Sequence, residues 1–210
     1  MEKMDTVLVD IDPRGVARVT LNRPDVHNAF DDALIVNLIG KLKDLDANQE
    51  VRVVILAAKG KSFSAGGDLG WMQRTADYSF DENLSDARDL AELMKTLNRL
   101  SKPTIGLIQG AAYGGGVGVV AACDIAISVR SATFSMTEVK LGLIPAVISP
   151  YVVAAIGGRQ ARRYFLTAER FDAVEAHRIG LVHLVVNDEG EMRAAADRFI
   201  RMFMETAPGA

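Results

Sequence analysis

The sequence predicts an α/β fold, and two observations support that prediction. Continuous apolar runs suited to buried strands stand at 51–58, 104–110 and 123–129, and helical patterns lie between them and dominate after Pro145. With 210 residues, 49% of them hydrophobic, the chain can bury a substantial core. The composition therefore favours a globular protein with strands and helices in alternation.

The N-terminal half opens with a predicted β-hairpin. The segments TVLVDID and GVARVTLN alternate apolar and polar residues around a Pro-Arg-Gly turn at 13–15. A helix is expected over 31–46, where two aspartates open it. The strand at 51–58 precedes a glycine-bearing loop, and a long helix fits 83–101, ended by a Lys-Pro pair.

The second half alternates a glycine cluster, a strand and several helices. A helix is expected to start near Gly115, between the strands at 104–110 and 123–129. The later expected elements are helices at 147–156, 159–168, 172–179 and 189–204, with a short strand at 181–186.

Composition excludes several classes of protein. A net charge of -3 without a dense Lys/Arg run gives no electrostatic basis for binding nucleic acid. No apolar run reaches the roughly 20 residues of a membrane span, so no membrane partner is expected. The single Cys123 cannot form an intrachain disulfide, the N-terminus lacks a signal-peptide pattern, and a cytoplasmic location is predicted. No spacing of His, Cys and Asp suggests a metal.

Two glycine-rich loops carry the main functional signal. Three consecutive glycines at 114–116 disfavour regular structure, so a ligand or another backbone is expected close to them. The helix start at Gly115 would offer free N–H groups to a carbonyl oxygen or an anion. The loop SFSAGGDL at 62–69 repeats the arrangement after another strand, so two N–H groups could meet one oxygen.

Four segments in this order resemble the enoyl-CoA hydratase/isomerase (crotonase) family. They are FSAGGDL, AAYGGGVGVVAACDIAI, FSMTEVKLGLIPA and RRYFLTAERFDAVEAHRIGLVHLV, and the N-terminal VARVTLNRPDVHNAF adds to the likeness. The resemblance implies a spiral of ββα units over 1–190. It also implies a helical C-terminal part, beginning at 191–210 and apparently truncated, that forms homotrimers or hexamers. The implied ligand is an acyl-CoA substrate, with no further cofactor.

The resemblance assigns roles residue by residue. It implies that the N–H groups of Gly67 and Gly115 hold the thioester oxygen and that Glu138 moves the proton beside it. The positions expected to contact coenzyme A or substrate are Arg23, His27, Ser64, Ala65, Gly66, Asp68, Leu69 and Gly118.

One departure from the family pattern reduces the number of activities that we expect for this chain. Typical hydratases carry a second glutamate where this chain has Gly118. Enoyl-CoA isomerases tolerate that loss, as do hydratases resembling those for 3-methylglutaconyl-CoA, and the run PAVISPYVVAAIG is similar to the latter. We therefore expect hydration of a carboxylated, branched enoyl-CoA, as in leucine degradation. The room left by Gly118 would let the substrate carboxylate, Tyr113 or Ser149 position the water.

Other classes of protein stay open at this point. The segment Gly116–Ala121 matches the GxGxxA dinucleotide fingerprint, but the glycines do not directly follow a strand. A serine hydrolase would need a glycine two residues before Ser64, where Ser62 stands. A CoA-binding member without catalytic activity is a third reading. Trp71 and Met72 could be core residues or walls of an acyl pocket.

Overall fold

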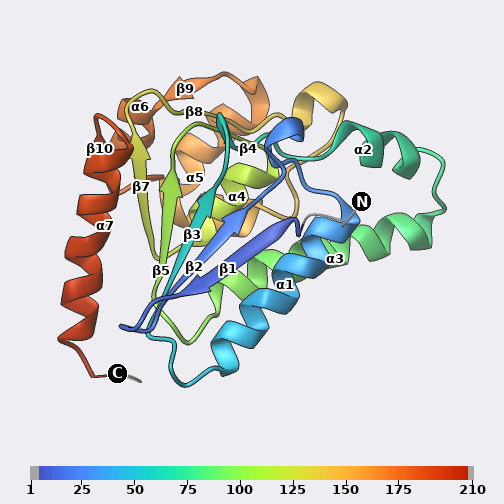
Figure 1. Cartoon of the computed structure of the whole chain (residues 1–210). Coiled ribbons are helices and arrows are strands. Elements are labelled where there is room, and N and C mark those ends of the chain that lie inside the picture. The colour runs from blue at the N-terminus through green and yellow to red at the C-terminus, as the bar shows by residue number, and fades with distance from the viewer. Residues whose placement is uncertain (1–4, 208–210) are drawn as a thin grey trace.

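The computed structural model describes residues 5–207 and confirms the α/β prediction (Figure 1). A six-stranded sheet has the order β1-β2-β3-β5-β7-β10. Its strands are β1 (Val7–Ile11), β2 (Val16–Leu21), β3 (Val53–Ala58), β5 (Thr104–Ile108), β7 (Ile125–Val129) and β10 (Leu184–Val186). Within residues 5–207, the β1–β2 pair is the one antiparallel pair of this large sheet, which confirms the hairpin.

A second sheet of four short strands is absent from the sequence-based prediction. Its order is β4-β6-β8-β9, formed by β4 (Ser62–Ser64), β6 (Ala111–Tyr113), β8 (Thr133–Ser135) and β9 (Phe171–Asp172). Because β4, β6 and β8 each follow a strand of the large sheet, the chain places successive ββ pairs in the two sheets. This alternation is the spiral of ββα units that the resemblance implies.

The helices follow the predicted order. α1 (Asp32–Ala47), α3 (Phe80–Asn98), α4 (Gly115–Ala122), α6 (Ala173–Arg178) and α7 (Glu189–Met204) agree with predicted helices within a few residues. α5 (Ser149–Thr167) is broken at Gly157, whose φ of 75° is non-helical, as the two predicted segments require. α2 (Leu69–Thr75) and the 3-10 turns η1 (Pro24–Val26) and η2 (Glu138–Leu141) complete the described elements.

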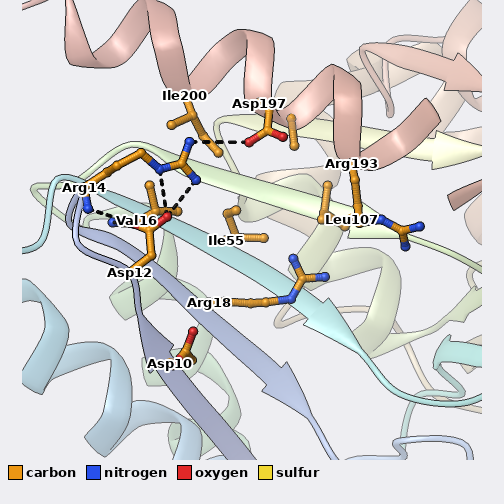
Figure 2. Close-up of a pocket in the computed structure, with 11 residues that line it drawn as sticks. Asp10, Asp12, Arg14, Val16, Arg18, Ile55, Leu107, Arg193, Asp197 and Ile200 are labelled. Atoms are coloured by element: carbon orange, nitrogen blue, oxygen red, sulfur yellow. Dashed lines mark hydrogen bonds and ion pairs between the residues drawn. The ribbon is translucent and has the colours of Figure 1, made fainter. Parts of the chain in front are cut away.

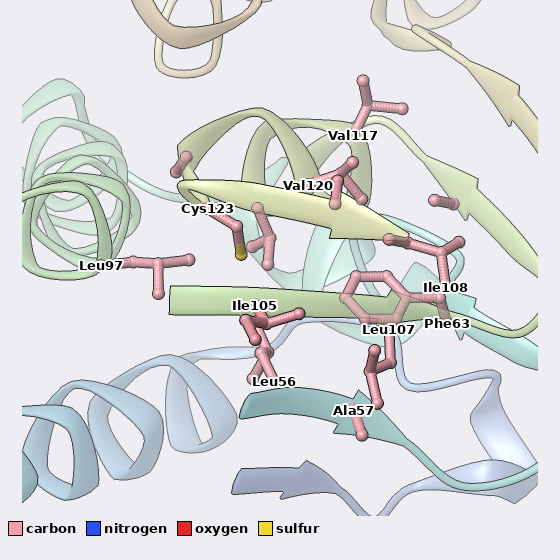
Figure 3. Packing of buried hydrophobic residues seen from close by; sticks show 14 of the residues in the cluster. Leu56, Ala57, Phe63, Leu97, Ile105, Leu107, Ile108, Val117, Val120 and Cys123 are labelled. Atoms are coloured by element: carbon pink, nitrogen blue, oxygen red, sulfur yellow. The ribbon is translucent and has the colours of Figure 1, made fainter. Parts of the chain in front are cut away.

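The core lies between the large sheet and the helices on either side. Figure 3 shows Leu56 and Ile105 from the sheet beside Val120 of α4, all at most 5% exposed. On the opposite face, α7 packs against β7 and β10, and Ile55 and Leu107 of the sheet line a hollow beside Ile200 of α7 (Figure 2). The predicted boundary between the spiral core and the C-terminal part, at residue 190, falls inside α7. The division of the chain into these two parts stays a prediction.

A polar cluster fastens α5 to α6. The hydroxyl of the fully buried Tyr164 donates to Glu175 Oε1 at 2.6 Å, and Arg178 on the next turn pairs with the same carboxylate. These hydrogen bonds lower the pKa of Glu175 to about 2, and the bond from Arg178 makes the largest contribution. Burial, with the nearby carboxylate, raises the pKa of Tyr164 to about 12.

We predict that Glu175 stabilises the fold in a pH-dependent way. Its folded-state pKa is below the unfolded value, so the stabilisation is complete above about pH 4.5 and is lost as the pH falls towards about 2. Chemical denaturation of Glu175→Gln should therefore show a deficit in the free energy of unfolding at pH 7 that closes across this window. Glu50→Gln, at an exposed position without an ion pair in residues 5–207, is the control. A deficit of constant size from pH 7 to pH 2.5 would contradict the assignment.

Candidate active site

A cavity of about 340 Å³ lies at the N-terminal ends of α2 and α4. Its lining includes Gly67 of the first glycine-rich loop, Gly115 of the second, and Glu138 of η2. The three residues for which the resemblance implies chemistry are therefore brought together from positions far apart in the sequence. Much of the remaining wall is apolar, including Phe30, Leu90 and the segment 143–148.

The backbone around Gly67 directs its N–H group away from the neighbouring chain. Phe30 N–H donates to the Gly66 carbonyl at 2.7 Å, and Asp68 N–H donates to the Phe30 carbonyl at 2.8 Å. In a trans peptide the N–H points opposite to the preceding C=O, so Gly67 N–H points away from Phe30. It has no acceptor within residues 5–207 and is free to meet a ligand in the cavity.

The N–H group of Gly115 is free for a different reason. The Gly114 carbonyl accepts from Val117 and Gly118 N–H groups along α4, so the Gly115 N–H points out of the helix start. Gly114 has a φ of 49° and a ψ of -119°, a conformation that favours glycine. The glycine cluster thus places in the cavity wall one donor that has no acceptor among the residues that the structure describes.

Glu138 is the buried acid of this cavity. Its Oε2 atom is buried and has no hydrogen-bond partner in the described part of the chain. Burial raises the pKa of Glu138 above its usual value, although its own backbone N–H partly opposes the shift. A carboxyl group with a raised pKa stays protonated to higher pH, which suits proton transfer beside two oxygen-binding donors.

The predicted coenzyme A contacts do not line this cavity. Ser64 is fully buried, and its hydroxyl donates to the Asn28 carbonyl at 2.9 Å. The Ser64 hydroxyl is therefore used inside the fold, and contact between this loop and coenzyme A stays a prediction. Arg23 pairs with Asp31 at 2.9 Å and with Asp68 at 3.2 Å, and its expected contact with coenzyme A stays a prediction.

The other predicted contacts occupy the surface around the first loop. Asp68 caps α2 by accepting from Trp71 N–H. Burial alone would raise the pKa of Asp68, but this bond and the charge of Arg23 outweigh burial and lower that pKa. His27 is exposed with Nδ1 3.1 Å from Ser62 Oγ, and Leu69 is 75% exposed. In the same loop, Ala65 N–H donates to the His27 carbonyl, and the Gly66 carbonyl accepts from Phe30 N–H. The roles of these residues in binding coenzyme A stay predictions.

Gly118 does not leave the room that the sequence suggests. A Cβ atom at this position would lie 2.3 Å from Ile148 Cγ2, because Ile148 fills the space beside α4. Gly118 is buried and lies outside the cavity wall. The other expected water-positioning groups also point elsewhere: Tyr113 Oη bonds Thr133 Oγ1 at 3.0 Å, and Ser149 Oγ bonds the Ala146 carbonyl at 3.0 Å.

Some cavity residues escaped the sequence-based prediction. Phe30, Asp86 and Thr137 all line the wall, yet none belongs to a glycine-rich loop. For Thr137 alone the sequence held a signal of its place in the cavity, because it directly precedes the predicted acid Glu138. Trp71 and Met72, left open between core and pocket, both line the cavity, and Trp71 Nε1 donates to Asp86 at 3.1 Å.

A second hollow, of about 180 Å³, lies between α7 and the hairpin and contains none of these residues (Figure 2). There Arg14 pairs with Asp12 and lies 3.7 Å from Asp197. Within residues 5–207 no group of three His, Cys, Asp or Glu side chains could hold a metal ion. Over the same range, no helix combines the length and apolarity needed to cross a bilayer.

Comparison with known proteins agrees with this geometry. The family model described as enoyl-CoA hydratase/isomerase matches residues 12–209. The chain belongs to the enoyl-CoA hydratase/isomerase family. An enoyl-CoA hydratase from Shewanella pealeana shares 45% identity and a TM-score of 0.95, over 99% of this chain and 77% of that one.

Relatives within the family carry different names. A protein of Escherichia coli named 1,2-epoxyphenylacetyl-CoA isomerase is 34% identical over 89% of this chain and 71% of its own. An enoyl-CoA hydratase of Alternaria alternata is 33% identical over 93% of this chain, which spans 64% of that relative's length. The enoyl-CoA hydratase/isomerase fold replaces the dinucleotide-binding reading, and the buried, bonded Ser64 removes the serine-hydrolase reading.

We predict that Gly118→Ala lowers the free energy of unfolding by about 1–3 kcal/mol, because the new methyl group overlaps Ile148. Gly40→Ala in α1 is the matched control, since nothing lies within 4 Å of its new Cβ, and it should stabilise by about 0.5–1 kcal/mol. Adding Ile148→Ala to Gly118→Ala should cost less than the sum of the two single changes. Additive costs in chemical denaturation would contradict the overlap.

We also predict that Arg23 stabilises the first loop through its two carboxylates. Replacing it by Gln leaves Asp31 and Asp68 without their charge partner at partly buried positions, so the free energy of unfolding should fall by about 1–3 kcal/mol. Arg14→Gln, at a half-exposed ion pair, should cost at most about 1 kcal/mol. Equal losses in the two variants would refute a special role for Arg23.

Proposed function

We propose that the protein hydrates an enoyl-CoA thioester. The observation that carries the proposal is the meeting of the Gly67 and Gly115 N–H groups with the Glu138 carboxyl group in one cavity. Two aligned donors suit an oxygen that gains negative charge, and a buried acid beside them suits proton transfer to an adjacent carbon. The names of the relatives support the same reaction class.

The proposed reaction uses each group in a defined way. Water oxygen bonds to Cβ of the enoyl group, and the π electrons move onto the thioester oxygen, which Gly67 and Gly115 hold as an enolate. Each donor is worth about 3–4 kcal/mol of barrier. Glu138 delivers its proton to Cα, and the surplus proton of the water returns to the Glu138 carboxylate. The reaction needs no cofactor beyond the coenzyme A carried by the substrate.

A carboxylated, branched acyl group similar to 3-methylglutaconyl is the finer proposal for the substrate. It rests on the likeness of the run PAVISPYVVAAIG and on the lack of a second glutamate at Gly118. No Lys or Arg lines the cavity in the described residues, so neutral donors would meet the distal carboxylate there. Arg163 is paired with Glu169 outside the cavity.

An enoyl-CoA isomerase is the second candidate. It requires one acid that shuttles a proton and no water, and Glu138 without a carboxylate at Gly118 fits that requirement. The E. coli relative named as an isomerase supports it. A homotrimer or hexamer is carried forward as a proposal from the family resemblance, and a cytoplasmic setting as a proposal from the single cysteine.

We predict that Glu138→Gln slows hydration by about 10²–10⁴-fold, because the isosteric amide cannot supply a proton. The measurement is product mass after incubation with crotonyl-CoA, 3-methylglutaconyl-CoA and a 3-enoyl-CoA. Glu50→Gln, on the exposed surface, should react as the wild type does.

The substrate panel separates the candidates. A water adduct with 3-methylglutaconyl-CoA that is lost in Glu138→Gln supports the finer proposal. Isomerisation of the 3-enoyl-CoA without water addition would replace hydratase by isomerase. If the wild type converted none of the three, the CoA-binding, non-catalytic reading would take precedence and binding would be measured.

A further inference from the structure

The hydroxyl group beside the catalytic carboxyl candidate has no assigned role. Thr137 directly precedes Glu138, lines the same cavity and is half-buried. Its Oγ1 atom makes no hydrogen bond within residues 5–207. The other polar wall side chains, Thr75, Asn83 and Asp86, each bond to neighbouring chain atoms.

The side-chain oxygens of Thr137 and Glu138 both lie close to Gly114, on the side where a Cβ atom would stand. A Cβ built on Gly114 would lie 3.3 Å from Thr137 Oγ1 and 3.3 Å from Glu138 Oε1. Gly114 also precedes Gly115, whose free N–H faces the cavity. A hydroxyl oxygen and a carboxyl oxygen thus lie on the same side of Gly114, next to the Gly115 N–H, and we expect one water molecule to bridge the two oxygens.

Each of the other groups that could orient water already has a partner or lies outside the cavity wall in the described residues. Ile148 occupies the space next to Gly118, while Tyr113 and Ser149 point to other partners. Asp86 accepts from Trp71. A neutral hydroxyl can accept a hydrogen bond from water and aim an oxygen lone pair without changing its own protonation.

Resting on the proposed hydratase function, we propose that Thr137 positions the water that adds to the enoyl double bond. Its hydroxyl accepts a hydrogen bond from the water, while the second proton of the water faces Glu138. After the oxygen has bonded to Cβ and Glu138 has given its own proton to Cα of the enolate, the second proton of the water passes to the Glu138 carboxylate. Thr137 keeps its proton throughout and is a positioning residue.

The test compares Thr137→Val and Thr137→Ser, the first of which removes the hydroxyl while keeping the branched shape. Two reactions are followed: hydration of the enoyl-CoA that wild type converts fastest, and deuterium exchange at Cα of butyryl-CoA. Exchange requires Glu138 and the two N–H donors but no added water. Thermal unfolding of each variant checks folding.

We predict that Thr137→Val lowers kcat for hydration by about 10²-fold with little change in KM. Thr137→Ser should recover most of the rate, and both variants should exchange deuterium as the wild type does. Glu138→Gln is the matched comparison and should lose both reactions.

Three results would overturn the role of Thr137. They are undiminished hydration by Thr137→Val, loss of exchange together with hydration, and dependence of hydration on a distal substrate carboxylate but not on Thr137. Failure of the proposed function itself is seen separately, because the wild type would then hydrate no enoyl-CoA before any variant is made.

Discussion

Two hydrogen bonds between Phe30 and the loop at 66–68 set the chemistry of the cavity. They occupy the Gly66 carbonyl and the Asp68 N–H, so peptide planarity leaves the Gly67 N–H facing the other way. Phe30 is itself held by buried surroundings, including Asn28, whose side-chain amide bonds the carbonyls of Lys59 and Ser62. The donor is thus aimed by backbone pairing, which costs no reorganisation during a reaction.

The spiral of strands explains why two separate loops can serve one oxygen. β4 and β6 are parallel neighbours in the small sheet, so the loops that follow them leave from the same edge. Close approach is needed there, since a Cβ at Gly116 would lie 2.7 Å from the Ser64 carbonyl. The glycine cluster therefore serves two purposes: Gly114 turns the chain, and Gly116 lets the second loop lie against the first.

The large sheet and the longer helices could be predicted because each has its own periodicity and end signals. The small sheet could not, since strands of two or three residues have too little pattern to distinguish them from loops. In the site, the family motifs located Gly67, Gly115 and Glu138. The tertiary contact partners of individual side chains could not be predicted. Nothing local in the sequence indicates that Arg23 pairs with Asp31 and Asp68, or that Ile148 fills the space beside Gly118.

Glu138 with the hydroxyl of Thr137 as its neighbour differs electrostatically from a pair of adjacent glutamates. Two carboxylates sharing a site repel, so one pKa rises and the two titrations become coupled. For Glu138 the pKa is raised by burial, with no charged neighbour contributing. Because Thr137 is neutral, the acid can gain and lose its proton without changing the charge of the group beside it. The pairing of Glu138 with Thr137 thus gives the proposed water a neutral partner and places no second charge directly beside the acid.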